Sequence, residues 1–140
     1  MVHRLFARAR PHHAQRAANA STEQLAEWQG LIERVRQGDR AQMMAWDEGT
    51  AARSVGTYQV LVTQRVHQRL RRAPPLLAGS VAGIAAVLRV DPTEASMIFR
   101  RRRLDDGGWT VAFGTAGGVL TYWVLQAERM VVLLDLTWTG

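Results

Sequence analysis

The sequence predicts an α+β fold of two layers, with helices on one face of an antiparallel sheet. Three observations support this prediction. Residues 58–63 alternate as one short strand, and two segments with helical spacing follow between residues 64 and 90. Residues 97–138 then divide into short runs rich in β-branched and aromatic residues, separated by Asp-Gly and Gly-Gly turns. We therefore expect the order strand, helix, helix, and a meander of three or four antiparallel strands, preceded by a helical extension.

Length and composition are those of one domain with an extension. The chain has 140 residues, of which 47% are hydrophobic, so it can bury a core. Its 18 basic residues are all arginine and outnumber the 12 acidic ones, which gives a formal net charge of +6. A surplus of guanidinium groups fits a phosphate-bearing partner, with nucleic acid as the leading candidate and an ordinary solvated surface as the alternative.

What the sequence lacks excludes several classes of function. Without cysteine there are no disulfides, no thiol catalysis and no cysteine-based zinc sites. No apolar run approaches the ~20 residues that a membrane crossing requires, so we expect a cytoplasmic protein that makes no membrane contact. A P-loop, a dinucleotide-binding glycine motif and paired catalytic carboxylates are also missing. We expect neither a metal ion nor another cofactor.

Residues 1–20 carry four arginines and no acidic residue, and their apolar content is mostly alanine. We expect a disordered basic tail. Such a segment also resembles an organellar transit peptide, and a start codon assigned too far upstream is an equal alternative. Met43 and Met44 are then the alternative starts.

Residues 21–54 are predicted to form an amphipathic helix and a linker. Ser21 and Gln24 have capping-box spacing at the start of the helix, and Gly38 is a plausible end. Because the helix has one apolar stripe, it must pack on the downstream domain, on a second copy or on a partner. The stripe consists of Leu25, Trp28, Leu31, Ile32 and Val35.

Residues 55–140 form the predicted α+β domain. Its first strand places Tyr58, Val60 and Val62 on one face. With helices on only one side, the other face of the sheet stays open unless the N-terminal helix or a second chain covers it. We therefore expect homodimerisation through this face or through the N-terminal helix.

Two helices follow the first strand. In the first, Val66 and Leu70 point inward together with His67, which as a lone histidine is a packing residue more often than a general base. The second helix has few polar residues and should be well buried, and Gly79 and Gly83 should permit close approach of its neighbour. Its apolar positions are Leu77, Val81, Ile84, Ala85 and Leu88.

The most conspicuous chemical feature is the run from Arg100 to Arg103. On a strand, Arg100 and Arg102 point to one face and Arg101 and Arg103 to the other, and four arginines require an edge strand. The functional interpretation is a clamp for RNA phosphates, with Arg101 and Arg103 as candidate catalytic residues that stabilise phosphoryl charge. The alternative is a solvated edge that prevents aggregation.

Tyr122 and Trp123 point to opposite faces of their strand, so one of them should lie on the open face. An aromatic side chain there, beside arginines, suits stacking on a base, while core packing is the alternative for each. Tyr122 and Arg72 complete the predicted set of RNA-binding residues. Trp109 and Phe113 share a core face, and Asp135 is expected to point away from the core.

These patterns resemble the RelE/ParE toxins over about residues 57–138. The resemblance implies an α+β toxin of a type II toxin–antitoxin pair, held inactive by a cognate antitoxin. In the RelE branch such toxins cleave messenger RNA in the ribosomal decoding site, and in the ParE branch they poison gyrase. The stretches that carry it are Tyr58-x-Val60-x-Val62-Thr63, a helical hairpin ending near Asp91-Pro92, Gly108-Trp109-x-Val111, Gly118-x-Leu120-x-Tyr122-x-Val124 and Val131-Val132-Leu133-Leu134.

The chain departs from the RelE pattern in two places. Val119 stands where RelE-type members usually carry an arginine, and the sequence stops at Gly140, where they commonly continue into a basic tail. The leading expectation is a ribosome-dependent messenger RNA endonuclease, in which the RNA's own 2′-hydroxyl attacks the adjacent phosphate. The rivals are a gyrase-poisoning toxin and a non-catalytic, degenerate toxin-fold module that binds a partner.

Overall fold

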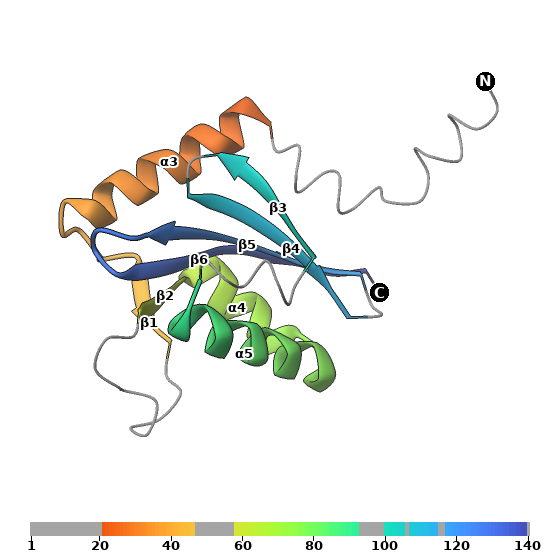
Figure 1. Ribbon diagram of the computed structural model, residues 1–140. Coiled ribbons are helices and arrows are strands. Elements are labelled where there is room, and N and C mark those ends of the chain that lie inside the picture. The colour runs from red at the N-terminus through yellow and green to blue at the C-terminus, as the bar shows by residue number, and fades with distance from the viewer. Residues whose placement is uncertain (1–20, 47–57, 93–99, 106, 115–116, 140) are drawn as a thin grey trace.

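A computed structural model describes residues 21–46, 58–92, 100–105, 107–114 and 117–139. These residues form an α+β fold in which three helices pack on a six-stranded mixed sheet (Figure 1). The predicted tail at 1–20 and residues 47–54 of the predicted linker lie outside the described residues. The elements are α3 (Thr22–Arg36), β1 (Met43–Ala45), β2 (Gln59–Thr63), α4 (Gln64–Arg72), α5 (Pro75–Val90), β3 (Arg100–Asp105), β4 (Gly108–Phe113), β5 (Gly118–Leu125) and β6 (Met130–Thr137).

The strand order is β1-β2-β6-β5-β4-β3. The last four strands pair antiparallel with their neighbours in sequence, whereas β2 lies parallel to β6 and β1 pairs antiparallel with β2. The predicted α+β class is confirmed, and the sheet is larger than predicted. Its extra strand, β1, falls in the expected linker. The sequence does not predict it, because three residues are too few to show alternation and they form a strand only by pairing with the edge of β2.

Helices cover both faces of the sheet, so the fold has three layers and not the predicted two. α4 and α5 lie on one face and α3 lies on the other (Figure 1). β5 is buried along its whole length, and β6 as far as Leu136, because their alternate side chains enter two separate apolar clusters. The sequence leaves open whether the N-terminal helix or a second chain covers this face, and in the structure α3 covers it.

The N-terminal helix begins and ends where the sequence predicts. The Ser21 hydroxyl accepts a hydrogen bond of 3.1 Å from the Gln24 amide. At the other end Gly38 has a φ of +90°, and Asp39 donates to the Arg34 carbonyl over 2.9 Å, which is a Schellman ending. The buried stripe consists of Trp28, Ile32 and Val35, and it packs against Leu61, Trp123, Leu125, Val132 and Leu134 of the sheet.

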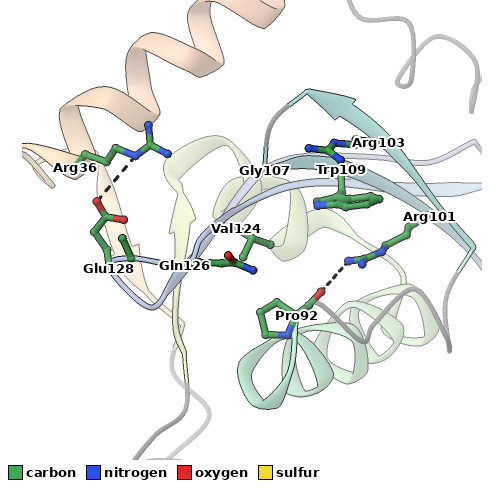
Figure 2. A pocket seen from close by; sticks show the side chains of 10 residues that line it. Arg36, Pro92, Arg101, Arg103, Gly107, Trp109, Val124, Gln126 and Glu128 are labelled. Carbon is green, nitrogen blue, oxygen red and sulfur yellow. Dashed lines mark hydrogen bonds and ion pairs between the residues drawn. The ribbon is translucent and has the colours of Figure 1, made fainter.

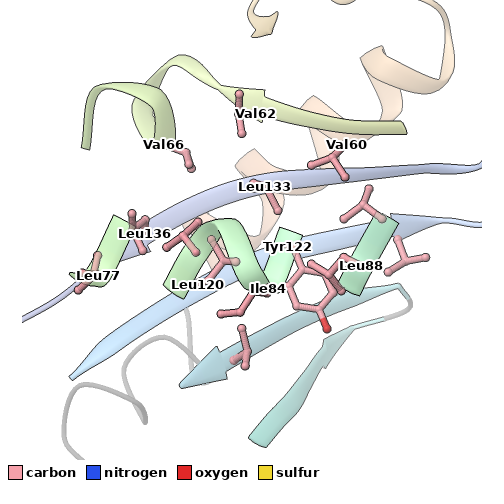
Figure 3. Close-up of a cluster of buried hydrophobic side chains, with 14 residues drawn as sticks. Val60, Val62, Val66, Leu77, Ile84, Leu88, Leu120, Tyr122, Leu133 and Leu136 are labelled. Atoms are coloured by element: carbon pink, nitrogen blue, oxygen red, sulfur yellow. The ribbon is translucent and has the colours of Figure 1, made fainter. Parts of the chain in front are cut away.

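The strand β2 passes into α4 without a loop, and Thr63 makes this junction. Its hydroxyl accepts a hydrogen bond from the Val66 amide (3.2 Å) and donates one to the Leu134 carbonyl (3.3 Å). The core between these helices and the sheet contains the predicted inward residues Val60, Val62 and Val66 (Figure 3). All five predicted apolar positions of α5 are buried as well.

Two predictions for the helices are wrong. His67 is exposed, because it lies one position beyond Val66 and so turns away from the sheet. Gly79 and Gly83 lie on the exposed side of α5, where a Cβ atom would meet nothing within 4 Å, so they do not mediate close helix packing. α5 is rich in apolar residues and is predicted to be well buried. In the structure only the face toward the sheet is covered, and Leu76 on the other side is 88% exposed.

The register of β6 changes at a bulge, and this determines the position of Asp135. Thr121 pairs with Asp135 but Tyr122 pairs with Leu133, so Leu134 is an extra residue and the alternation of faces is broken there. Asp135 is 8% exposed, contrary to the prediction that it points away from the core. Its Oδ1 accepts a hydrogen bond from the Leu136 amide (2.9 Å) and lies 3.2 Å from Nε of Arg65 on α4.

Candidate functional site

The arginine run lies on β3, which is at the edge of the sheet and among the described strands pairs with β4 alone, as predicted. Arg101 is opposite Val111 and Arg103 is opposite Trp109, so both are on the face that carries α4 and α5. Arg102 is exposed and opposite Thr110, on the other face. The side chain of Arg100 lies outside the description.

Arg101 is held by three groups. Its Nη1 donates hydrogen bonds to the Pro92 carbonyl (2.7 Å) and to the Tyr122 hydroxyl (3.0 Å). Its guanidinium carbon lies 3.8 Å from the centroid of the Trp109 ring. Arg101 therefore joins the end of α5 to the centre of the sheet, and its position is fixed by contacts within the chain.

Arg103 and Arg101 both approach the same indole. The guanidinium carbon of Arg103 lies 5.8 Å from the Trp109 centroid, and the Arg103 side chain is exposed. Trp109 itself is half-buried, with part of its surface against the core and part toward solvent. The three side chains form an arginine–tryptophan platform on the outer part of the sheet (Figure 2).

A pocket of about 570 Å³ opens over this platform. It is bounded by the β3–β4 edge, by Pro92 after α5, and by Gln126 and Glu128 in the turn between β5 and β6 (Figure 2). Arg36 of α3 closes one side, with its Nε 3.9 Å from Oε2 of Glu128. Among the described lining residues, three guanidinium groups face one carboxylate, which suits the pocket to an anion, and its volume is in the range of small-molecule sites.

Tyr122 does not have the role that the sequence predicts. It is 1% exposed, inside the cluster between the sheet and α5 (Figure 3), and its hydroxyl accepts a hydrogen bond from Arg101. Burial raises the pKa of the phenol above its ordinary value of 10.0, and the Arg101 guanidinium partly opposes this. Trp123 is also buried, on the α3 side, so neither aromatic side chain can stack on a base. The expected open face does not exist, because α3 covers it.

The structure separates Arg72 from the arginine run. Arg72 is exposed at the end of α4 and lines another hollow, with Arg65, Arg69 and Trp138. Conversely, Trp109, predicted to be a core residue, lies in the pocket. The sequence does contain a signal for this position. Trp109 lies opposite Arg103 in the hairpin at the edge of the sheet, and a side chain at an edge is covered on fewer sides than one in a central strand.

Comparisons of the chain with protein-family models, with curated proteins and with solved structures find no match. Within the described ranges, none of the helices is long and apolar enough to cross a membrane. The same residues contain no cluster of three or more histidine or acidic side chains that would hold a metal ion.

Proposed function

We propose that the protein binds single-stranded RNA in the Arg101–Trp109 pocket and acts as the toxin of a toxin–antitoxin pair. The observation that carries the proposal is the arginine–tryptophan platform, a half-buried indole approached by two guanidinium groups. Aromatic faces and guanidinium planes are the groups on which proteins stack unpaired bases and neutralise their phosphates. The order of β2, α4, α5 and the strands β3 to β6 supports the RelE/ParE resemblance.

In this proposal the reaction is RelE-like cleavage of messenger RNA on the ribosome. The 2′-hydroxyl of the RNA attacks the adjacent phosphate and closes a 2′,3′-cyclic phosphate, while the bond from phosphorus to the 5′-oxygen of the next nucleotide breaks. The 2′-hydroxyl loses its proton to water, the leaving 5′-oxygen takes up a proton from water, and the protein contributes position and charge. Arg103, with its exposed side chain, is placed to contact the phosphate. Arg101, held by Pro92 and Tyr122, acts as a positioning residue for Trp109. The cognate antitoxin and the ribosome are the expected partners, in the cytoplasm.

A second candidate is a non-catalytic module of the same fold. The pocket offers no histidine, and its one carboxylate, Glu128, is paired with Arg36, so a general acid or base is missing among the described lining residues. Val119 is buried in β5, which leaves no exposed position there for the arginine typical of RelE members. Binding without cleavage would be the result that favours this candidate.

The test compares two neighbouring arginines of the same strand. Arg103→Ala removes a guanidinium from the pocket, and Arg102→Ala removes one from the opposite face of β3, where it is also exposed. With a fluorescent single-stranded RNA in an anisotropy titration, we expect Arg103→Ala to weaken binding about fivefold and Arg102→Ala by less than about twofold. If both variants lose the same RNA affinity, binding depends on the overall positive charge of the protein and not on a defined site in the pocket.

Activity is tested by induced expression in a bacterial host, with protein synthesis and DNA replication followed separately. Early loss of protein synthesis, abolished by Arg103→Ala and retained by Arg102→Ala, is the result expected for the RNA-cleaving toxin. Replication arrest before translation arrest would indicate a gyrase target instead. Normal growth together with RNA binding in vitro would favour the non-catalytic module.

A further inference from the structure

A second basic hollow lies along α4, outside the Arg101–Trp109 pocket. Its volume is about 470 Å³, and it is lined by Arg65, Gln68, Arg69, Arg72 and Trp138. The four helical residues stand at positions i, i+3, i+4 and i+7, so they share one face of α4. We call this hollow the α4 groove. It combines three guanidinium groups with an indole from the residue that follows β6.

The bulge in β6 gives the α4 groove its only close carboxylate among the described residues. β2 pairs with β6 as far as Leu133, and beyond that point the edge of β6 faces α4. Asp135 Oδ1 lies 3.2 Å from Arg65 Nε and 4.0 Å from Arg69 Nε. The carboxylate is shielded, whereas the side chains of Arg65 and Arg69 are 57% and 37% exposed. Asp135 therefore orients Arg65 and Arg69 from the buried side of the groove. Its single negative charge offsets one of the three positive charges that line the groove.

The remaining positive charge extends along the helix. Arg72 is exposed, and within the described residues it makes no ion pair. From Arg65 to Arg72 the axis of an α-helix rises by about 10 Å, so the guanidinium groups form a row and not a single cup. A row of charges matches a linear polyanion better than it matches one small anion.

We propose that the α4 groove is a second contact for single-stranded RNA, with phosphates on the arginine row and a base stacked on Trp138. Trp138 is half-buried against the core, which holds the indole in place while part of its surface remains accessible. An acidic protein segment would use the arginines but would not need the accessible part of the indole, which is why RNA is the favoured ligand. The ligand class rests on the proposed function, but none of the groove residues belongs to the Arg101–Trp109 pocket.

Adjacent arginines of α4 provide a matched test. Arg72 lines the groove, and Arg71 is also exposed on α4 but is not among the residues that line the groove. In anisotropy titrations with a labelled single-stranded RNA over a range of salt concentrations, Arg72→Ala should weaken binding about fivefold. The slope of log K against log salt, which is negative, should become less steep by about 0.7 because one phosphate contact is lost. Arg71→Ala should change affinity by less than about twofold. Gln68→Arg, which adds a charge to the row, should strengthen binding.

The role of Trp138 has its own readout. Trp138→Leu should remove the part of the tryptophan fluorescence quenching that RNA produces at this site, while thermal unfolding monitors whether the fold is retained. Equal effects of the Arg71 and Arg72 substitutions, or unchanged quenching in Trp138→Leu, would overturn the proposal. Displacement of RNA by polyglutamate more readily than by polyphosphate would also overturn it and point to an acidic protein partner.

The Arg103→Ala variant separates this inference from the proposed function. If Arg103→Ala binds RNA normally while Arg72→Ala does not, the α4 groove is the RNA site and the Arg101–Trp109 pocket is not. If Arg72→Ala binds normally while Arg103→Ala does not, the further inference fails and the proposed function stands. Losses in both variants, with Arg71→Ala and Arg102→Ala unaffected, would support two contacts on one strand.

Discussion

The guanidinium carbon of Arg101 lies 3.8 Å from the centroid of the Trp109 ring. The same guanidinium donates to the Pro92 carbonyl and to the Tyr122 hydroxyl. One side chain thus connects the edge hairpin, the end of α5 and the core. This arrangement makes Arg101 a determinant of stability as well as of the shape of the pocket.

Replacing Arg101 with alanine should therefore lower the free energy of unfolding by about 2–3 kcal/mol, because a cation–π contact and two hydrogen bonds are lost. Arg101→Lys should recover only part of this, since an ammonium lacks the planar guanidinium that packs over the Trp109 ring. Urea denaturation provides the measurement. Arg102→Ala is the control, and we expect a change within about 0.5 kcal/mol because Arg102 is exposed. A similar loss in both variants would contradict the role assigned to Arg101.

Gly108 is required by the close approach of Trp123. A Cβ atom at Gly108 would lie 2.6 Å from the Trp123 ring, which is itself enclosed by α3. Gly108→Ala should destabilise the protein by about 1–3 kcal/mol through overpacking. Gly83→Ala on α5 is the matched control, because its Cβ would meet nothing within 4 Å. That substitution should stabilise the helix by about 0.5–1 kcal/mol, as thermal unfolding of both variants would show.

Tyr122 should make stability fall at alkaline pH. Its pKa in the folded protein is raised by burial, so the unfolded chain ionises first as the pH increases. The stabilisation is fully present below the ordinary phenol pKa of 10.0 and is lost progressively as the pH rises from there through the folded-state pKa. The free energy of unfolding of the native chain relative to Tyr122→Phe should decline above this pH. A pH-independent difference would show that the phenol is not held neutral.

Asp135 should couple energetically to Arg65. The carboxylate is shielded and Arg65 Nε lies 3.2 Å away, but the arginine is more than half exposed, so we expect a coupling of about 0.5–1 kcal/mol. A double-mutant cycle with Asp135→Asn and Arg65→Ala measures it, and asparagine keeps an oxygen that can accept from the Leu136 amide. Substituting Arg71 in place of Arg65 in the same cycle should give a coupling near zero.

Part of the candidate site could be predicted from the sequence. The edge position of the arginine run followed from its charge, and the opposite faces of Arg102 and Arg103 followed from strand alternation. Trp109 is expected in the core because an apolar residue in a strand is usually covered, yet in the structure it is half-buried and lines the pocket. Tyr122 was expected near the arginines on an open surface, and it does contact Arg101, but from inside the core.

The sequence by itself determined the features that depend on neighbours along the chain. The caps of α3, the buried stripes of α3 and α5, and the alternation of β2 follow from spacing and local hydrogen bonds. Only the tertiary structure decided which surfaces these stripes meet. The third layer exists because α3 covers the second apolar face of β5 and β6, and β1 exists because the edge of β2 offers hydrogen-bonding groups to a short segment. The bulge in β6 likewise reverses the expected position of Asp135, since it changes the register between strands, which no local pattern specifies.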